Sequence, residues 1–349
     1  MSPLDRPSRP GTTTQADLAR ELGIAKETVS RALNDHPRVS SALRERVRDA
    51  AKRLNYRPNA AALAMKHQRF RQIGVVIPDD PQRPRLRFRA FKMELIAGVN
   101  VTLEEAGYSA LLLHAGTKVS NANSLGRILR EHAIDGAIVV GTLPDNTRSH
   151  IESLTGHTVF LESNYWVDTG CFRRDEAAAG RLVGEAVVRG GYRDVVWFKG
   201  DTTAERLLNF SEVGRHAGLS EVVQGAGLPI RSFGHRKWEL PFDEERRFFD
   251  SLTPETAVVS YDAANARWLE GACLRHGMMP ARDFGLACCD DIHEFDFTWD
   301  ELSRVVFDRY RLGGLAAERI LHWLETGNAP KSQCTVDHWI AGSLLPPRT

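Results

Sequence analysis

The residues best placed for contact chemistry lie in one short stretch of the chain, residues 13–34. Polar and charged side chains occupy one face of a helical pattern there (Lys26, Glu27, Ser30 and Arg31), and apolar residues occupy the other (Val29, Ala32 and Leu33). A second short helical pattern precedes it, and Gly23 separates the two. Two short helices joined by a glycine-containing turn form a helix-turn-helix, whose second helix can enter a DNA major groove. The stretch therefore predicts a DNA-binding element, with an ordinary helical hairpin in a core as the alternative.

The other reactive side chains show no pattern typical of an enzyme. His293-Glu294 and Asp290-Asp291 bring imidazole and carboxylates close together, but no metal-ligand or nucleophile pattern surrounds them. The motifs GxGxxG, GxSxG and HExxH and the P-loop are absent. The cysteines show no CxxC pairing: Cys171, Cys273, Cys288, Cys289 and Cys334. We therefore expect no enzyme, no cofactor and no metal.

Charge is distributed unevenly along the 349 residues, although the net charge is only +1. Residues 1–71 carry 15 Lys and Arg against 7 Asp and Glu, a balance of +8, which leaves −7 for the remainder. A basic head on an acidic body suggests a head that binds a polyanion. No apolar run reaches the roughly 18 residues of a membrane span, and no secretory signal is visible, so we expect a cytoplasmic protein without a membrane partner. Residues 1–12 are expected to be a disordered lead-in.

A third helix is expected after the turn at residues 35–38. Ser40 is its expected N-cap, and apolar residues recur at helical spacing from Leu43 to Leu54. Pro58 limits the helix, because the residue before proline is disfavoured in the α region. These helices predict a small all-α domain at 13–57. A linker at 58–71 follows, and its good helix formers at 58–66 form a segment too short to be stable alone.

From Arg71 onward, strand and helix patterns alternate. Apolar, β-rich runs at 73–77, 137–140 and 256–260 stand between helical patterns such as 175–189 and 310–326. Such alternation predicts an α/β fold of doubly wound parallel sheets, whose ligands bind beyond the carboxyl ends of the strands. The strands are too many for one comfortable sheet, so two similar lobes are expected.

Head and body together resemble the LacI/GalR family of bacterial transcriptional repressors. The most specific similarity lies in TVSRALN at 28–34, RVS at 38–40 and LNYRPN at 54–59, and the resemblance extends from about Thr13 to at least Trp323. It implies a body at 72–349 that is similar to a periplasmic sugar-binding protein. Lobe one is then expected at about 72–163 and 294–327, and lobe two at about 164–293 and 328–349.

The resemblance also assigns DNA contacts. Lys26 and Glu27 stand at the positions that usually choose the operator sequence, and Arg31 is expected to reach base edges or phosphates. Lys and Arg donate to guanine O6 and N7, and Glu can accept from cytosine N4. Taken singly, the alternative for Lys26 and Glu27 is a solvated face. The residues expected to contact the DNA backbone are Thr13, Thr28, Ser30, Asn34, Arg38, Tyr56 and Asn59.

The linker has a role in the family as well, as a hinge helix that folds in the minor groove when it pairs with its twin. Met65 stands where the family has a leucine that wedges between base steps, and an apolar methionine can still wedge. Lys66 is expected at the groove wall. Ala25 departs from the family's usual serine cap, and losing an N-cap side chain costs about 0.5–2 kcal/mol.

A small-molecule effector, mostly a sugar in this family, is expected between the lobes. Arg206 matches an arginine that grips a ligand hydroxyl or carboxylate, and Asp290 matches an acidic residue that accepts ligand hydroxyls. Phe91 matches an aromatic that stacks on a ring. Asp262 follows a strand end at the same cleft, and Trp166 offers another stacking face. For each position the alternative is a structural salt bridge or a core aromatic.

One departure concerns this ligand set, because Tyr261 replaces the asparagine that usually precedes Asp262. The whole pattern predicts a ligand-regulated, homodimeric repressor of carbohydrate-metabolism genes that binds a palindromic operator. Effector-driven lobe closure would control the folding of the hinge segment. The alternative is a solute-binding protein with a helical appendage that does not bind DNA, and the basic head argues against it.

Overall fold

The computed structural model describes residues 13–56, 69–78, 90–115, 134–141, 145–200, 210–235, 241–291, 301–335 and 338–347. The chain divides into two compact units, Met1–Phe70 and Arg71–Thr349. The expected lead-in at 1–12 and most of the expected linker lie outside the described residues.

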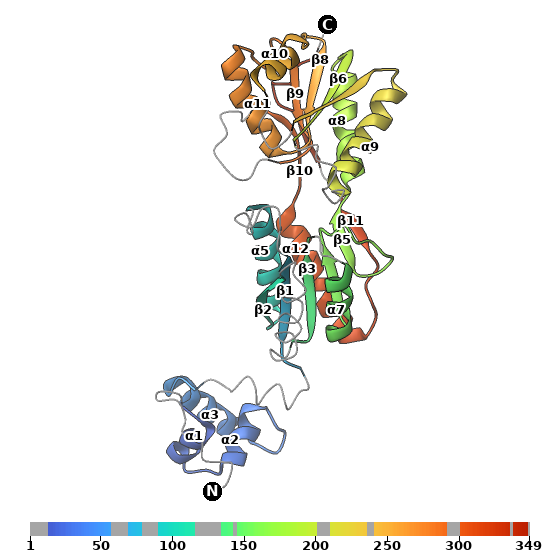
Figure 1. Ribbon diagram of the computed structural model, residues 1–349. Coiled ribbons are helices and arrows are strands. Elements are labelled where there is room, and N and C mark those ends of the chain that lie inside the picture. Colours follow the sequence, from blue (N-terminus) through green and yellow to red (C-terminus); the bar gives the residue numbers. More distant parts are fainter. Residues whose placement is uncertain are drawn as a thin grey trace. The chain divides into compact units, whose positions relative to one another are not determined.

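The head is a small domain whose described helices are α1 (Gln15–Leu22), α2 (Lys26–Leu33) and α3 (Ser41–Arg53) (Figure 1). A capping box begins α1, because Thr14 Oγ1 accepts a hydrogen bond from Asp17 N at 3.3 Å and Asp17 Oδ2 accepts one from Thr14 N at 2.9 Å. Gly23 ends α1 in the left-handed conformation, at φ 66°. The buried core consists of Leu18, Val29, Ala32, Val39, Val47 and Ala50. The predicted all-α helix-turn-helix head is confirmed.

Lobe one of the body is built on a sheet with the order β11-β5-β4-β3-β1-β2, and every neighbouring pair is parallel. Its strands are β1 (Gln72–Pro78), β2 (Ser109–Ala115), β3 (Gly136–Val140), β4 (Thr158–Leu161), β5 (Cys171–Arg174) and β11 (Gln333–Thr335). Helices α5 (Ala90–Glu105) and α12 (Arg309–Thr326) cover one face, and α7 (Asp145–Thr155) contributes to the core on the other. Because both faces are covered, a strand such as β3 is buried along its whole length.

Lobe two repeats this plan with the order β12-β10-β9-β8-β6-β7, in which only the β10–β12 pair is antiparallel. Its strands are β6 (Asp194–Gly200), β7 (Ile230–His235), β8 (Thr256–Ser260), β9 (Gly285–Cys288), β10 (Ser303–Val306) and β12 (His338–Ile340). Helices α8 (Glu176–Arg189) and α9 (Phe210–Gly225) cover one face, and α10 (Phe242–Asp250) and α11 (Ala263–His276) cover the other (Figure 1). The predicted two-lobed α/β body is confirmed.

The strands divide between the lobes differently from the expected boundaries. Strand β5 was expected within lobe two (164–293) but pairs with β4, and β11 was expected there too (328–349) but pairs with β5. Strand β10 was expected within lobe one (294–327) but pairs with β9. At each of the three points where the chain passes from one lobe to the other, it therefore does so one strand later than expected. A strand belongs to the sheet that satisfies its backbone hydrogen bonds, and an apolar run alone does not reveal which sheet that is.

Two glycines let α8 and α9 approach closely in lobe two. A Cβ added at Gly218 would lie 2.0 Å from the carbonyl oxygen of Ala177, and one at Gly180 would lie 2.0 Å from that of Arg215. Only glycine tolerates such an approach without displacing the backbone. The contact brings Arg215 of α9 beside Glu176, the first residue of α8.

Candidate functional site

The exposed face of α2 is the first candidate site. Lys26, Glu27 and Arg31 are exposed, whereas Val29 and Ala32 on the opposite face are buried in the head core. The apolar contacts of Val29 and Ala32 therefore fix the orientation of α2 and leave its charged face free to contact a partner. Ala25 occupies the N-cap and makes no side-chain cap hydrogen bond, because its methyl group has no acceptor atom.

The charges on α2 have no partner within the described residues of the head. Within residues 13–56, Lys26, Glu27 and Arg31 make no ion pair and no side-chain hydrogen bond. Elsewhere in the head, Arg20 pairs with Asp17 at 3.0 Å, and the ion pairs Arg48–Asp35 and Arg53–Glu21 join separate segments. Donors and an acceptor without partners on one helix face are suited to an external polar surface.

The structure places the other predicted DNA contacts less uniformly. Asn34 and Arg38 are exposed, and Thr28, Ser30 and Tyr56 are half-buried. The Thr13 hydroxyl donates to the carbonyl of Leu54 at 2.6 Å, so its only O–H is already used within the chain. The side-chain amide of Asn34 donates to the Ser30 carbonyl at 2.5 Å, which leaves one of its two N–H groups. Asn59, Met65 and Lys66 lie outside the described residues.

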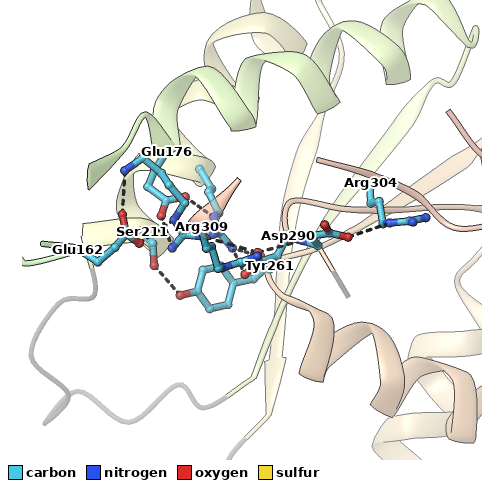
Figure 2. Close-up of polar contacts among 10 residues, drawn as sticks. Glu162, Glu176, Ser211, Tyr261, Asp290, Arg304 and Arg309 are labelled. Atoms are coloured by element: carbon cyan, nitrogen blue, oxygen red, sulfur yellow. Dashed lines mark hydrogen bonds and ion pairs between the residues drawn. The ribbon is translucent and has the colours of Figure 1, made fainter. Parts of the chain in front are cut away.

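The second candidate site is a buried cluster of charges where the lobes join (Figure 2). Lobe one contributes Glu162, Arg174 and Arg309, which follow β4, end β5 and begin α12. Lobe two contributes Glu176, which begins α8, Arg215 from α9, and Asp290, which follows β9. All except Asp290 have side chains less than a tenth exposed, and Asp290 is 16% exposed. Three guanidinium groups thus face three carboxylates, and we refer to these six residues as the interlobe cluster.

Of the three arginines in the interlobe cluster, Arg174 makes the most ion pairs. Its Nε lies 2.7 Å from Glu162 Oε2, its Nη2 lies 2.9 Å from Glu176 Oε1, and its Nη1 lies 3.5 Å from Asp290 Oδ1. Its backbone N–H also donates to Glu162 Oε1 at 2.8 Å. Glu162 itself has a left-handed backbone, at φ 54°, which is uncommon for a residue with a Cβ. The cluster therefore ties the end of β5 to both lobes.

Arg215 and Arg309 complete the interlobe cluster around Asp290. Arg215 Nη1 lies 3.1 Å from Asp290 Oδ2, its Nε lies 2.5 Å from Glu176 Oε2, and Arg309 Nη2 donates to Asp290 Oδ1. Burial alone would raise the pKa of the Asp290 carboxyl, but Arg215, Arg309 and Arg174 hold that pKa well below its usual range. Asp290 is therefore a carboxylate whose charge is shared by three guanidinium groups.

Two family models match most of this chain. Residues 14–59 match the model for bacterial regulatory proteins of the lacI family, and residues 71–235 match the model for periplasmic binding proteins and the sugar binding domain of the LacI family. The chain belongs to the LacI family.

Individual relatives of this LacI-family protein match over different lengths. The HTH-type transcriptional regulator RegA of Clostridium saccharobutylicum is 32% identical over 152 residues, which span 43% of this chain and less than half (44%) of RegA. The ribose operon repressor of Lactococcus lactis subsp. lactis is 28% identical over 338 residues, 95% of this chain and 98% of the repressor. The lac repressor dimer bound to operator and the anti-inducer ONPF shares the fold, with a TM-score of 0.75 at 17% identity over 96% of this chain and 99% of its own.

The effector contacts that the resemblance assigns to this LacI-family chain are engaged within the chain wherever the structure describes them. Asp290 belongs to the interlobe cluster. Asp262 caps α11, where its Oδ1 accepts from Asn265 N at 2.8 Å and from Asn265 Nδ2 at 2.7 Å. One face of the Trp166 ring is covered by the guanidinium of Arg173, 4.3 Å from the ring centroid. Arg206 and the side chain of Phe91 lie outside the described residues.

Tyr261, the departure from the family's asparagine, is a core residue here. It is 6% exposed, its hydroxyl lies 2.8 Å from Ser211 Oγ, and its carbonyl oxygen accepts from Arg215 Nη1 at 2.8 Å. Burial raises the pKa of its phenol, so the hydroxyl stays protonated and can donate to Ser211. Tyr261 thus supports Arg215 from the side of β8.

Sequence reasoning missed most of the interlobe cluster. Of its six residues only Asp290 was singled out; Glu162, Arg174, Glu176, Arg215 and Arg309 were not. One signal was present for Arg215, because it recurs with Ser211, Gly218 and Leu219 on the buried stripe of α9. A charged residue on a buried stripe requires a partner, but the identity of that partner depends on the tertiary fold.

Possible metal ligands and cysteines are the remaining reactive groups of the described residues. No group of three or more His, Cys, Asp or Glu side chains there could hold a metal ion. Cys171, Cys273, Cys288 and Cys289 are buried, and burial raises the pKa of the Cys289 thiol to about 12, which keeps it protonated and unreactive. In the described part of the chain no helix is both long and apolar enough to cross a membrane.

Proposed function

We propose that this LacI-family protein is a sequence-specific DNA-binding transcriptional regulator that represses its target genes. The observation that carries the proposal is the face of α2, where Lys26, Glu27 and Arg31 are exposed without internal partners on a helix held by a buried core. Lys26 and Arg31 supply donors for guanine, and Glu27 supplies an acceptor for cytosine N4. The DNA sequence is read by these three side chains.

Backbone contacts position α2 in the groove. Thr28, Ser30, Asn34, Arg38 and Tyr56 are exposed or half-buried, and each carries a polar group that can reach a phosphate. Thr13 can take part through its backbone N–H, because its hydroxyl donates to Leu54. The protein acts in the cytoplasm as a homodimer, because a palindromic operator mirrors the two-fold symmetry of its reader.

The body is the sensor, and its effector is a sugar or a sugar derivative that binds between the lobes. The interlobe cluster lies at this junction, so a ligand that contacts Arg309 or Asp290 alters the ion pairs that cross from one lobe to the other. Such a ligand shifts the lobe arrangement only by its different affinity for the two states. The segment at 58–66, with Asn59, Met65 and Lys66, transmits the change to DNA as a hinge helix.

The function is tested with the purified full-length protein and a random DNA pool. Repeated selection is expected to yield a palindrome. Fluorescence anisotropy on that palindrome is expected to show that the logarithm of the binding constant falls linearly with the logarithm of the salt concentration. Sedimentation of the complex is expected to give two chains per palindrome. A pool that yields no common sequence, with binding equal on all duplexes, would contradict the proposal.

A further inference from the structure

Arg309 holds two buried donors that the described chain does not satisfy. Its side chain is 4% exposed, and its Nη2 donates to Asp290 Oδ1. Its Nε and Nη1 are fully buried and have no hydrogen-bond partner among the described residues. A buried donor without a partner costs roughly 1–3 kcal/mol, more when it is charged, and native proteins rarely leave one without a reason. The two nitrogen atoms lie on different edges of the planar guanidinium, so at least two acceptor oxygens are needed.

The carboxylates of the interlobe cluster do not supply those acceptors in this structure. Asp290 Oδ2 takes Arg215 Nη1 at 3.1 Å, and its Oδ1 accepts from the Asp291 N–H at 2.9 Å in addition to Arg309 Nη2. Glu176 is engaged by Arg215 and Arg174, and Glu162 by Arg174 alone. Glu176 Oε1 lies 2.9 Å from Arg174 Nη2 but makes no hydrogen bond among the described residues, and no carboxylate oxygen of the cluster accepts from Nε or Nη1 of Arg309.

Arg309 is also the least neutralised of the three arginines. Arg174 forms ion pairs with three carboxylates and Arg215 with two, whereas Arg309 forms one, with Asp290, which it shares with both. It is, moreover, the first residue of the 18-residue helix α12, whose N-terminal end favours negative charge. The ring of Phe307 lies 5.3 Å from its guanidinium carbon and offers no oxygen.

We propose that Arg309 binds the acidic group of the effector, and that the effector is a hydroxylated acid, a sugar acid or a sugar phosphate, rather than a neutral sugar. The acidic group meets one edge of the guanidinium and a neighbouring hydroxyl meets the other. This assignment rests on the proposed function, since it names the ligand class of the same sensor. Asp290 is then a positioning residue, which holds Arg309 and Arg215 in place instead of accepting ligand hydroxyls.

Carboxylate and phosphate present the same chemistry to arginine, so the test separates them. Isothermal titration of the full-length protein uses D-glucose, D-galactose and D-ribose, each beside its carboxylate form and its phosphate ester. At least one acid is expected to bind about tenfold or more tightly than its neutral parent, a difference of about 1.4 kcal/mol. The better of the carboxylate and phosphate arms identifies the acidic group.

The variant R309Q removes the charge of the guanidinium. It is expected to lower the affinity for that acid by about tenfold or more and to change the affinity for the neutral parent sugar far less. R311Q is the matched control on the same helix, because Arg311 is exposed, and it is expected to leave acid binding unchanged. If R309Q does not fold, R309K takes its place, since it keeps the charge but loses the planar arrangement of donors.

The proposal is overturned if no acid in the panel binds, if a neutral sugar binds as tightly as its acid, or if R309Q and R311Q behave alike. Operator binding by the ligand-free wild type is measured separately with the selected palindrome. Loss of that binding would contradict the proposed regulator function, whereas failure of the acid titration with intact operator binding would contradict only the assignment of the ligand class.

Discussion

Arg215 Nη1 and Asp290 Oδ2 lie 3.1 Å apart, although Arg215 belongs to α9 and Asp290 follows β9, 75 positions later in the chain. Arg215 is 1% exposed, so its charge depends on Asp290 and Glu176 for compensation. The neighbouring Arg174 and Arg309 of lobe one reach the same Asp290. The charge of one carboxylate therefore links the two lobes, and several measurable properties follow.

Removing that charge is expected to destabilise the body strongly. Asp290→Asn leaves three buried guanidinium groups with two carboxylates, and breaking a buried ion pair costs about 3–5 kcal/mol. Denaturant unfolding should report this loss in the transition of the body. Asp250→Asn is the matched control: its pair with Arg246 is exposed at 3.8 Å, so it should change stability by less than about 0.5 kcal/mol. Equal losses of stability in the two variants would argue that the interlobe cluster does not stabilise the body.

The same carboxylate predicts how stability depends on pH. The folded protein holds the pKa of Asp290 below its ordinary value of 3.8, so the unfolded chain binds the proton first as the pH falls. The stabilisation is complete above the unfolded pKa and is lost progressively below about pH 5. The wild type should thus lose stability more steeply than Asp290→Asn between about pH 5 and pH 3, as measured by urea unfolding at each pH. Parallel curves for the two proteins would contradict this expectation.

Close packing of α8 and α9 is expected to depend on Gly218. In Gly218→Ala the new Cβ meets the Ala177 carbonyl oxygen, so the helices must separate, and such overpacking typically costs about 1–3 kcal/mol. Gly225→Ala on the same helix is the control, because nothing lies within 4 Å of its added Cβ. It should be neutral or slightly stabilising, since alanine is the better helix former. Thermal unfolding distinguishes the two variants.

A capping side chain at the start of α2 is expected to stabilise the head. Ala25 has an extended backbone, at φ −66° and ψ 146°, which suits an N-cap, but it offers no side-chain acceptor. Ala25→Ser should stabilise the head by about 0.5–2 kcal/mol. Ala42→Ser, in the first turn of α3 behind the existing cap Ser40, should give no comparable gain. Denaturant unfolding of the head, followed by circular dichroism, would detect the difference.

Exchanging Lys26 and Glu27 is expected to redirect operator choice without unfolding the head. Both side chains are exposed and lack partners within residues 13–56, so the melting temperature should change little. The sequence selected from a random DNA pool should change at the base pairs that α2 faces, each such contact being worth about 1–3 kcal/mol. Exchange of the neighbouring exposed residues Glu45 and Arg46 on α3, which likewise make no ion pair within residues 13–56, serves as the control. An unchanged palindrome would mean that α2 does not read the bases.

Local sequence patterns predicted the parts of this protein that depend on interactions between residues close together in the chain. Helices α1, α2 and α3 follow from apolar residues at helical spacing, the capping serine Ser40 and the turn glycine Gly23, because each of these acts within a few residues. The buried strands of the body follow from their continuous apolar runs, and the charges of α2 follow from being on the face opposite Val29 and Ala32. The sequence thus determined the fold class, the DNA-binding element and the family resemblance.

Only the tertiary structure decided which residues meet at the junction of the lobes. Strand β5 belongs to lobe one because its hydrogen bonds are made with β4 and β11. The apolar pattern of the sequence does not indicate to which of the two sheets the strand belongs. Asp290 was expected to await a ligand, but folding brings Arg174, Arg215 and Arg309 to it from distant positions. A buried charge must find compensation wherever the fold supplies it, and the partners are set by the packing of whole elements rather than by neighbours in sequence.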